Sequence, residues 1–474
     1  MAAWFAKFLQ TWKLHILVLG LAVLGVLSIL KGFVPRARGL GLYIWLTTYQ
    51  HGFIRRGLLG TLVSPWVQNS DPEAVRLGLV GIHVILLILI GGLAAILAWE
   101  FLRRHRQRVG YAFIFLACFF SSHFLGTIAY NAAEADAIMA VLLILIAIFA
   151  GSTAAGLGFI LILVIGTLIH EMFLISAFPL ILYSVLTPLL TTEKVGDRRR
   201  TVFSALVLLG STLALVILIL HTNQPSEEFR TTFLNFGMSE RRASQVLERK
   251  LGQSLGGSLV MLAGIWRSHG LNASMGLAYS LLPSVGMLLI YWGWLKKPEF
   301  SNNALGGRAL PLIRTAFFLL ACYGPVLVLA LAFDLSRLAQ FANLTTFLTC
   351  VMDSRLAQGR DAQPQLIPEQ EVADQPDQRI STPGWRRRFP PHFAAGLGGA
   401  IASIYLLSPV SYLYFSTGRI VEAPALRPAQ LPLTPAAKRW MCFYNRKNLE
   451  AHQQASNPRP RQRRLRHLAY CQKR

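Results

Sequence analysis

Charged residues are scarce in this chain. Only 14% of its 474 residues are Asp, Glu, Lys or Arg, and 54% are hydrophobic, whereas a soluble globular domain is about 25% charged. Uninterrupted apolar runs of roughly 18 or more residues have the length that a helix needs to cross a bilayer. The alternating strands of about ten residues that mark a membrane β-barrel are not visible. The composition therefore excludes a soluble or disordered protein and predicts an all-α fold, a polytopic integral membrane helical bundle.

Cysteine is also rare, and its spacing is not that of a metal site or a redox pair. The chain has five cysteines and no CxxC, which excludes a disulfide scaffold and a zinc ribbon. Cys118, Cys322 and Cys350 lie in apolar runs. We expect them to be small buried hydrophobes.

Acidic residues are outnumbered by basic ones, 22 against 46, which gives a formal net charge of +24. In a soluble protein this excess would indicate nucleic acid. Here the basic residues lie mostly in loops and in a tail, where they set the topology and contact anionic lipid headgroups. We therefore expect membrane lipids as partners, no nucleic acid, and a multi-pass membrane location, which the resemblance given below would make a bacterial inner (plasma) membrane.

The hydropathy pattern predicts about 11 spans. Four arginines in EFLRRHRQRVG mark one cytoplasmic loop. The predicted parts are a bundle at 1–352 with outer loops at 33–78 and 221–270, a polar cytoplasmic linker at 353–392, a last transmembrane helix at 393–415, and a basic, poorly ordered tail at 416–474. Residues 157–190 fit one tilted helix or two short ones. Two helices that meet at His170–Glu171 are preferred, because they keep the basic GDRRR segment inside.

The second outer loop predicts two amphipathic helices. In the first, Phe229, Phe233 and Phe236 recur at helical spacing. In the second, which Ser239 could cap, the apolar face is formed by Ala243, Val246, Leu247 and Leu251. These helices either lie on the bilayer surface or pack against the protein's own spans.

Polar residues in apolar surroundings are the candidate site residues, because they are costly to place in a membrane. The first cluster is YQHGFIRRGLLGTL, with His51, Arg55 and Arg56. One guanidinium group can bind two phosphate oxygens at once, and glycine lets the backbone come close to the phosphate. The cluster therefore indicates a phosphate site. Contact with lipid headgroups is the alternative.

His170 and Glu171 are the second candidate, deep in the apolar stretch 157–190. They could transfer a proton or contact a transition state, or they could pair with an arginine of another segment. The sequence HEMFL lacks the second histidine of a zinc protease, so no metal site is predicted. The sequence does not identify a cofactor.

Two further pairs of charged residues are candidates. Glu134 and Asp136 lie in a short turn, where they could orient a sugar hydroxyl or the arginines of the first loop, or simply keep the turn soluble. Asp334 and Arg337 are three residues apart on one helical face and could hold a substrate or neutralise each other. The predicted topology places all four clusters on the outer face.

This layout resembles the polytopic bacterial glycosyltransferases of the GT-C type and the related lipid-linked glycan polymerases. The resemblance covers about residues 1–415 and implies a polyprenyl-phosphate-linked sugar as donor at the outer leaflet, in cell-envelope polysaccharide assembly. It implies substrate binding by His51, Arg55, Arg56, Glu134, Asp136 and Arg337, and catalytic roles for His170, Glu171 and Asp334.

The chain departs from the GT-C pattern in its first outer loop. Such enzymes place a catalytic carboxylate near the end of the first span, but the acids here are Asp71 and Glu73, close to the second span. The arginines and the histidine are more similar to the active-site residues of lipid-linked oligosaccharide polymerases and O-antigen ligases. Two alternatives stay open: a transporter or flippase of a lipid-linked or anionic solute, and a non-catalytic membrane protein.

Overall fold

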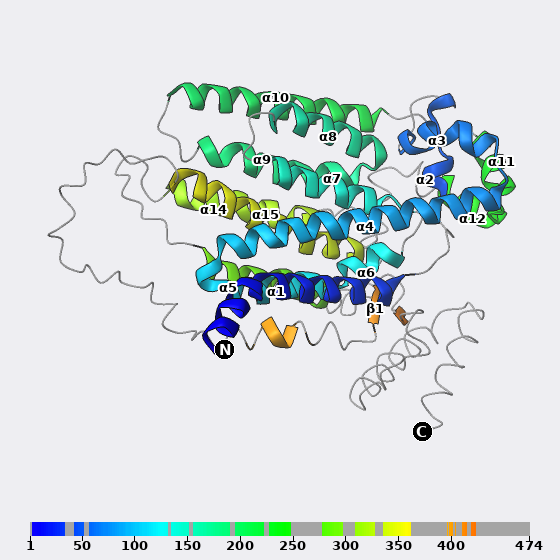
Figure 1. Ribbon diagram of the computed structural model, residues 1–474. Coiled ribbons are helices and arrows are strands. Elements are labelled where there is room, and N and C mark those ends of the chain that lie inside the picture. The colour runs from blue at the N-terminus through cyan, green and yellow to red at the C-terminus, as the bar shows by residue number, and fades with distance from the viewer. Residues whose placement is uncertain are drawn as a thin grey trace, which may run out of the picture.

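The computed structural model is almost entirely helical (Figure 1). The structure describes residues 2–33, 42–51, 56–130, 134–150, 155–189, 195–221, 227–247, 277–296, 309–327 and 335–361, and short pieces between 396 and 422. The helical fold predicted from the composition is confirmed for these residues.

The helices that form the bundle lie side by side (Figure 1). They are α1 (Ala2–Gly32), α4 (Pro72–Arg104), α5 (Val109–Phe120), α6 (His123–Tyr130), α7 (Asp136–Phe149), α8 (Ala155–Ile169), α9 (Met172–Leu189), α10 (Val195–Leu220), a helix at Leu277–Leu295 that ends in the π-helical turn η5 (Tyr291–Leu295), α14 (Ala309–Leu327) and α15 (Leu335–Asp361). A 3-10 turn, η3 (Arg106–Arg108), joins α4 to α5.

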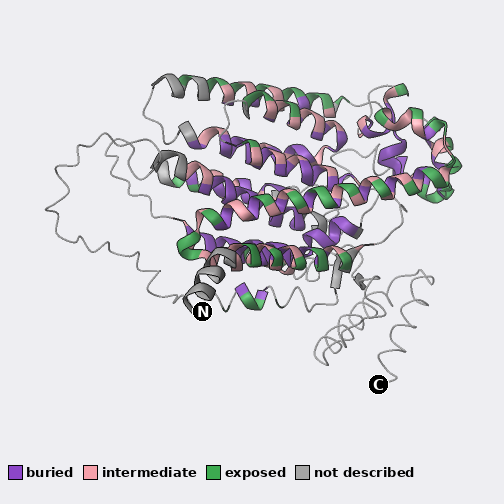
Figure 2. Cartoon of the chain, in the orientation of Figure 1, coloured by how far each residue is buried: buried purple, intermediate pink, exposed green. Residues whose placement is uncertain are grey.

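Four helical segments are long and apolar enough to cross a membrane: Pro72–Arg104, Arg106–Ala129, Val202–Ile219 and Leu277–Leu295. The outer helix α10 shows exposed residues along most of its length (Figure 2), including Phe203 and Leu213. A wide exposed apolar surface of this kind is what contact with lipid requires. The total of 11 spans remains a prediction.

Short helices gather at one end of the bundle (Figure 1): α2 (Tyr43–Leu46), the 3-10 turn η2 (Tyr49–His51), α3 (Leu58–Gln68), α11 (Glu227–Asn235) and α12 (Glu240–Val246). Phe229, Phe233 and Phe236 are buried in one cluster with Tyr43 of α2 and Val246 of α12. Two helices, α11 and α12, thus lie in the predicted second loop, and the apolar residues of both that the structure describes pack against the protein itself. Leu251, which was predicted on the second apolar face, lies outside the described residues. Their place on the outer face remains a prediction.

Local chemistry explains where two of the long helices begin. Asp71 caps α4, because its carboxylate accepts a hydrogen bond of 2.9 Å from the Glu73 amide, and Pro72 occupies the first helical position. The apolar stretch at 157–190 forms two helices, α8 and α9, which are interrupted at His170–Glu171. The predicted interruption is thereby confirmed.

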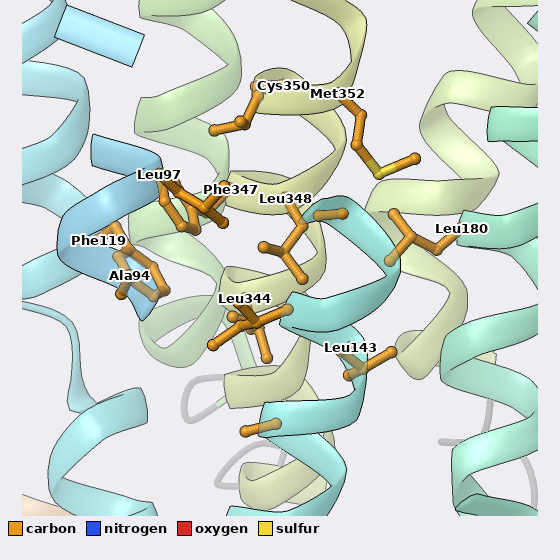
Figure 3. Close-up of a cluster of buried hydrophobic side chains, with 14 of the residues drawn as sticks. Ala94, Leu97, Phe119, Leu143, Leu180, Leu344, Phe347, Leu348, Cys350 and Met352 are labelled. Carbon is orange, nitrogen blue, oxygen red and sulfur yellow. The ribbon is translucent and has the colours of Figure 1, made fainter. Parts of the chain in front are cut away.

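Helix α15 is the centre of the bundle. Residues 339–354 are all buried, and the helix packs against α4, α6, α7, α9 and α14. Figure 3 shows Leu344, Phe347 and Leu348 of this helix among side chains of neighbouring helices. Because α15 continues to Asp361, the predicted end of the bundle at 352 is corrected: the first part of the supposed linker belongs to this helix.

The predicted last span, 393–415, is not helical throughout. Residues Val410–Tyr414 form strand β1, which pairs antiparallel with β2 (Arg419–Glu422), so that Leu413 lies opposite Ile420. Pro409 disfavours continuation of a helix, and the following residues are mostly β-branched or aromatic, which favours a strand. Residues 362–395 and the tail after 422 lie outside the described residues.

The central position of α15 predicts a large cost for opening a hole there. Phe347 is fully buried and stacks on Phe119, with ring centroids 4.3 Å apart. We expect Phe347→Ala to lower the free energy of unfolding by about 3–5 kcal/mol, measured by thermal unfolding in detergent. Leu213→Ala on α10, where Leu213 is 62% exposed, is the control and should change stability little. Equal effects would contradict the central role of α15.

Candidate functional site

The structure brings Arg56 and Glu171 together, although they are far apart in the sequence. The Arg56 Nε donates to Glu171 Oε2 at 2.8 Å, and Nη2 donates to Glu171 Oε1. The remaining Nη1 donates to the Tyr43 hydroxyl. The two charged side chains are 10% and 25% exposed. Such a forked pair fixes the direction of both groups, at the end of the bundle where the short helices gather.

The chain positions Arg56 by an unusual backbone conformation and a close approach. Arg56 has a φ of 66°, in the left-handed region. Just beyond it, a Cβ on Gly60 would lie 1.9 Å from the Thr47 carbonyl oxygen, so only glycine lets α3 pack there. The Thr61 hydroxyl accepts from the Tyr49 amide at 2.8 Å and donates to the Gly57 carbonyl. These contacts fix the loop that carries the guanidinium.

His170 holds the interruption between α8 and α9. Its Nδ1 accepts a hydrogen bond of 3.2 Å from the Met172 amide and therefore satisfies one of the unpaired amides at the start of α9. The same Nδ1 lies 3.8 Å from the Glu171 carboxylate. His170 thus positions the turn, and Glu171 is the group that faces Arg56.

The pKa of the Glu171 carboxyl is the result of two opposing effects. Burial raises it, but the charge of Arg56 and the hydrogen bonds from its guanidinium outweigh burial, so that the pKa lies below its ordinary value. Glu171 is therefore ionised at neutral pH. Nearby, burial raises the pKa of Tyr49 to about 12, so its hydroxyl keeps its proton.

The other predicted site residues are placed less completely. Asp136 is buried at the start of α7 and Glu134 is partly exposed in the preceding turn. Ala135, between them, packs in the same cluster as Tyr43 and Ile169. Arg55, Asp334 and the side chains of His51 and Arg337 lie outside the described residues. Three of the predicted residues, Arg56, His170 and Glu171, are thus brought together.

A second ionic centre, which the sequence did not predict, surrounds Asp353 of α15. This carboxylate is 1% exposed. It accepts hydrogen bonds from Tyr183 of α9, from Tyr291 at 2.8 Å and from Arg314 of α14 at 2.7 Å, and Lys296 lies 3.7 Å away. Asp353 follows directly after an apolar run, so it resembled the first residue of a polar linker.

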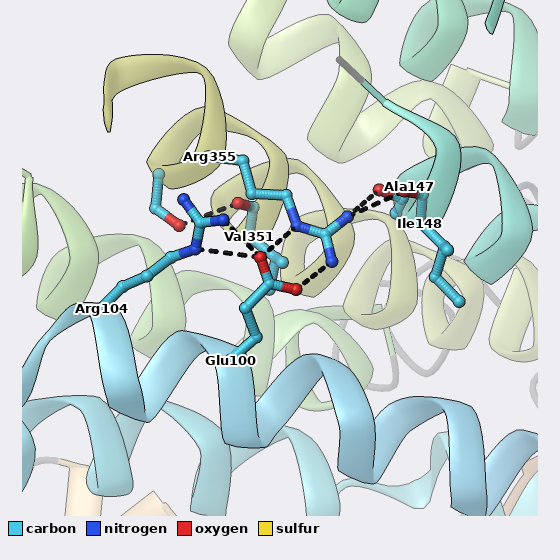
Figure 4. Close-up of polar contacts among 7 residues, drawn as sticks. Glu100, Arg104, Ala147, Ile148, Val351 and Arg355 are labelled. Atoms are coloured by element: carbon cyan, nitrogen blue, oxygen red, sulfur yellow. Dashed lines mark hydrogen bonds and ion pairs between the residues drawn. The ribbon is translucent and has the colours of Figure 1, made fainter. Parts of the chain in front are cut away.

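A third network lies close by on the same helix (Figure 4). Arg355 donates to both carboxylate oxygens of Glu100 on α4, and Arg104 donates to the same carboxylate. Arg355 also donates to the Ala147 and Ile148 carbonyls. It thereby places a cation at the carboxyl end of α7, where the helix dipole favours one. The sequence does not single out Glu100, because it stands next to the four arginines of the predicted cytoplasmic loop and looks like part of that basic segment.

The pairing of Glu171 predicts a pH-dependent stability. A carboxyl whose pKa is lowered by folding contributes stability that is present above its ordinary pKa of about 4.3 and is lost as the pH falls further, through its folded pKa. We expect Glu171→Gln to lower the free energy of unfolding at pH 7 by about 2 kcal/mol. The difference from the wild type should shrink below about pH 4. Thermal unfolding of both proteins from pH 3 to pH 8 tests this, and a difference that is the same at every pH would contradict it.

The described residues thus present a cation and a carboxylate in a fixed fork, bordered by Tyr43 of α2, which packs in one cluster with phenylalanines of α11. Comparison with models of protein families, with curated proteins and with solved structures finds no match for this chain. The chemistry of this arrangement is therefore the basis for inferring a function.

Proposed function

We propose that the protein is a membrane glycosyltransferase or glycan polymerase that uses a polyprenyl-phosphate-linked sugar at the outer leaflet, in cell-envelope polysaccharide assembly. The observation that carries this proposal is the Arg56–Glu171 fork. It joins a cation suited to phosphate with a carboxylate suited to a hydroxyl group, at the end of a helical bundle whose long apolar helices fit a membrane.

In the proposed reaction Arg56 and Glu171 have separate roles. The donor phosphate binds the Arg56 guanidinium and takes the place of the Glu171 carboxylate. Once it has lost that cation, Glu171 is a stronger base, because the charge of Arg56 no longer lowers its pKa. The carboxylate then accepts the proton of the acceptor hydroxyl while the hydroxyl oxygen bonds to the anomeric carbon of the sugar.

The leaving group needs the cation. As the bond between the anomeric carbon and the phosphate oxygen breaks, the electron pair stays on the phosphate, and the developing negative charge is stabilised by Arg56. Tyr43, whose hydroxyl accepts from Nη1 and whose ring centroid lies 5.7 Å from the guanidinium carbon, keeps the cation in place. The partly exposed edge of the pair, on the Glu171 side, is where an acceptor would approach.

One observation favours the alternative, a transporter or flippase of a lipid-linked or anionic solute. Asp353, Arg314 and Lys296 form a charged centre inside the bundle, and buried ionisable groups often mark a transport path. The Asp353 carboxylate of this centre accepts hydrogen bonds from three side chains, and helices pack closely around it, as expected for a structural role. The transferase therefore remains the better-supported proposal.

Exchanging the two charged residues of the fork distinguishes a catalytic pair from a structural one. We expect Arg56→Glu/Glu171→Arg to fold, since the ion pair is re-formed, but to leave no cation at the phosphate position. In a strain that lacks the wild-type gene, this variant should accumulate lipid-linked donor at the outer leaflet as the deletion does. Surface glycans and lipid-linked intermediates are profiled together, and protein level and melting temperature are recorded.

The control is Arg230→Ala, because Arg230 is an exposed arginine of α11 that pairs with Glu227 and Glu240. It should restore the wild-type profile. Full restoration by the exchanged pair would show that the fork is only structural and would refute the proposal. Accumulation at the inner leaflet would favour the flippase instead, and an unchanged profile in the deletion strain would exclude both glycan functions.

A further inference from the structure

Five buried oxygen atoms near the interruption between α5 and α6 have no hydrogen-bond partner among the residues that the structure describes. Each belongs to a side chain that is almost completely buried. They are Ser121 Oγ, Ser122 Oγ, Thr127 Oγ1, Ser280 Oγ and Asn343 Oδ1. Buried polar atoms without a partner are uncommon in proteins and indicate a bound water or ion.

These atoms belong to three helical elements that meet. His123, next to Ser122, has its Nε2 2.9 Å from the Tyr279 hydroxyl. Asn343 of α15 donates from Nδ2 to the Ser280 carbonyl at 3.0 Å. The rings of Phe124 and Phe341 lie edge to face with centroids 5.6 Å apart. The α5–α6 interruption, the helix at Leu277–Leu295 and α15 therefore form one junction inside the bundle.

The orientation of Asn343 shows what its free oxygen requires. The Nδ2 group uses both of its hydrogens, on the Ser280 carbonyl and on Gln340 Oε1 at 3.0 Å. This fixes the amide and leaves Oδ1 as an acceptor that needs a donor. Elsewhere in the bundle the hydroxyls of Thr167, Thr187 and Thr349 donate to the carbonyl four residues earlier. Thr127 does not, and neither does Ser280.

We propose that this junction is an internal water-binding site. The side chains that line it carry hydroxyl, amide and imidazole groups, and the described residues contain no group of three or more His, Cys, Asp or Glu side chains that could hold a metal ion, so the site suits a neutral donor and acceptor better than a metal ion. Water donates to Asn343 Oδ1 and accepts from the serine and threonine hydroxyls. The site is independent of the Arg56–Glu171 fork.

Bound water also explains why the helix is interrupted here. The Ser121 and Ser122 amides bond to the Ala117 and Phe119 carbonyls in a tight turn, and the next helix begins at His123. An interrupted helix inside a bundle is stable where water or side chains satisfy its freed groups. The unpaired serine hydroxyls at the turn are the groups that such water would reach.

Matched threonine substitutions test the site. Thr127→Val removes a hydroxyl that lacks a protein partner, and Thr167→Val removes one that donates to the Leu163 carbonyl at 2.6 Å. Both threonines are buried in helices. If water occupies the junction, both variants should melt a few degrees below the wild type. A melting temperature of Thr127→Val above that of the wild type would show that the junction is dry and overturn the proposal.

Direct observation is the second measurement. High-resolution cryo-electron microscopy of the full chain in lipid nanodiscs should show density about 3 Å from Asn343 Oδ1. Empty space at that position refutes the proposal. Replacement of sodium chloride by choline chloride distinguishes a cation: a lower melting temperature without sodium would show that the junction binds a cation rather than water.

Discussion

An ionised group inside an apolar helical bundle must be paired by the protein, because hydrocarbon offers it no partner. The ionic groups that the structure describes obey this constraint: each carboxylate of the fork, of the Glu100 network and of the Asp353 centre is paired with a cation. The Arg56–Glu171 fork lies beside the start of α4, and the Glu100 network lies near the end of that helix. Between residue 76, near the start of α4, and Glu100, near its end, the helix is about 36 Å long. This is slightly more than the roughly 30 Å thickness of a bilayer core.

Helix α15 is the partner that most of these interactions share. It supplies Asp353 to α9, α14 and the helix at Leu277–Leu295, and Arg355 to α4 and α7. It is buried over most of its length, so its polar groups have no route to water except through other side chains. The packing around Phe347 and the ionic centres therefore depend on each other. The fork at the opposite end is held by short helices and by a loop fixed through Gly60 and Thr61.

Several features could be predicted from the sequence, and the reasons are physical. The interruption at His170–Glu171 was predictable because two helices that meet there keep the basic GDRRR segment on the inner side of the membrane. The two amphipathic helices α11 and α12 followed from apolar residues at helical spacing, but only the structure shows that their apolar faces are buried against the protein. By contrast, Asp353 came after an apolar run and was assigned to a linker, because a single carboxylate carries no sign of the two tyrosines and the arginine that surround it. Strand β1 was assigned to a helix because hydropathy does not distinguish the two.

The sequence by itself determined that this chain is helical, that its long helices are apolar enough for a membrane, and which few polar residues were candidates for function. Hydropathy and helical spacing depend only on residues that are close together in the sequence, so they can be evaluated without knowledge of the fold. Only the tertiary structure decided that Arg56 pairs with Glu171, that His170 caps α9, and that α15 is central. These facts depend on the distance between segments far apart in the chain, which packing alone sets.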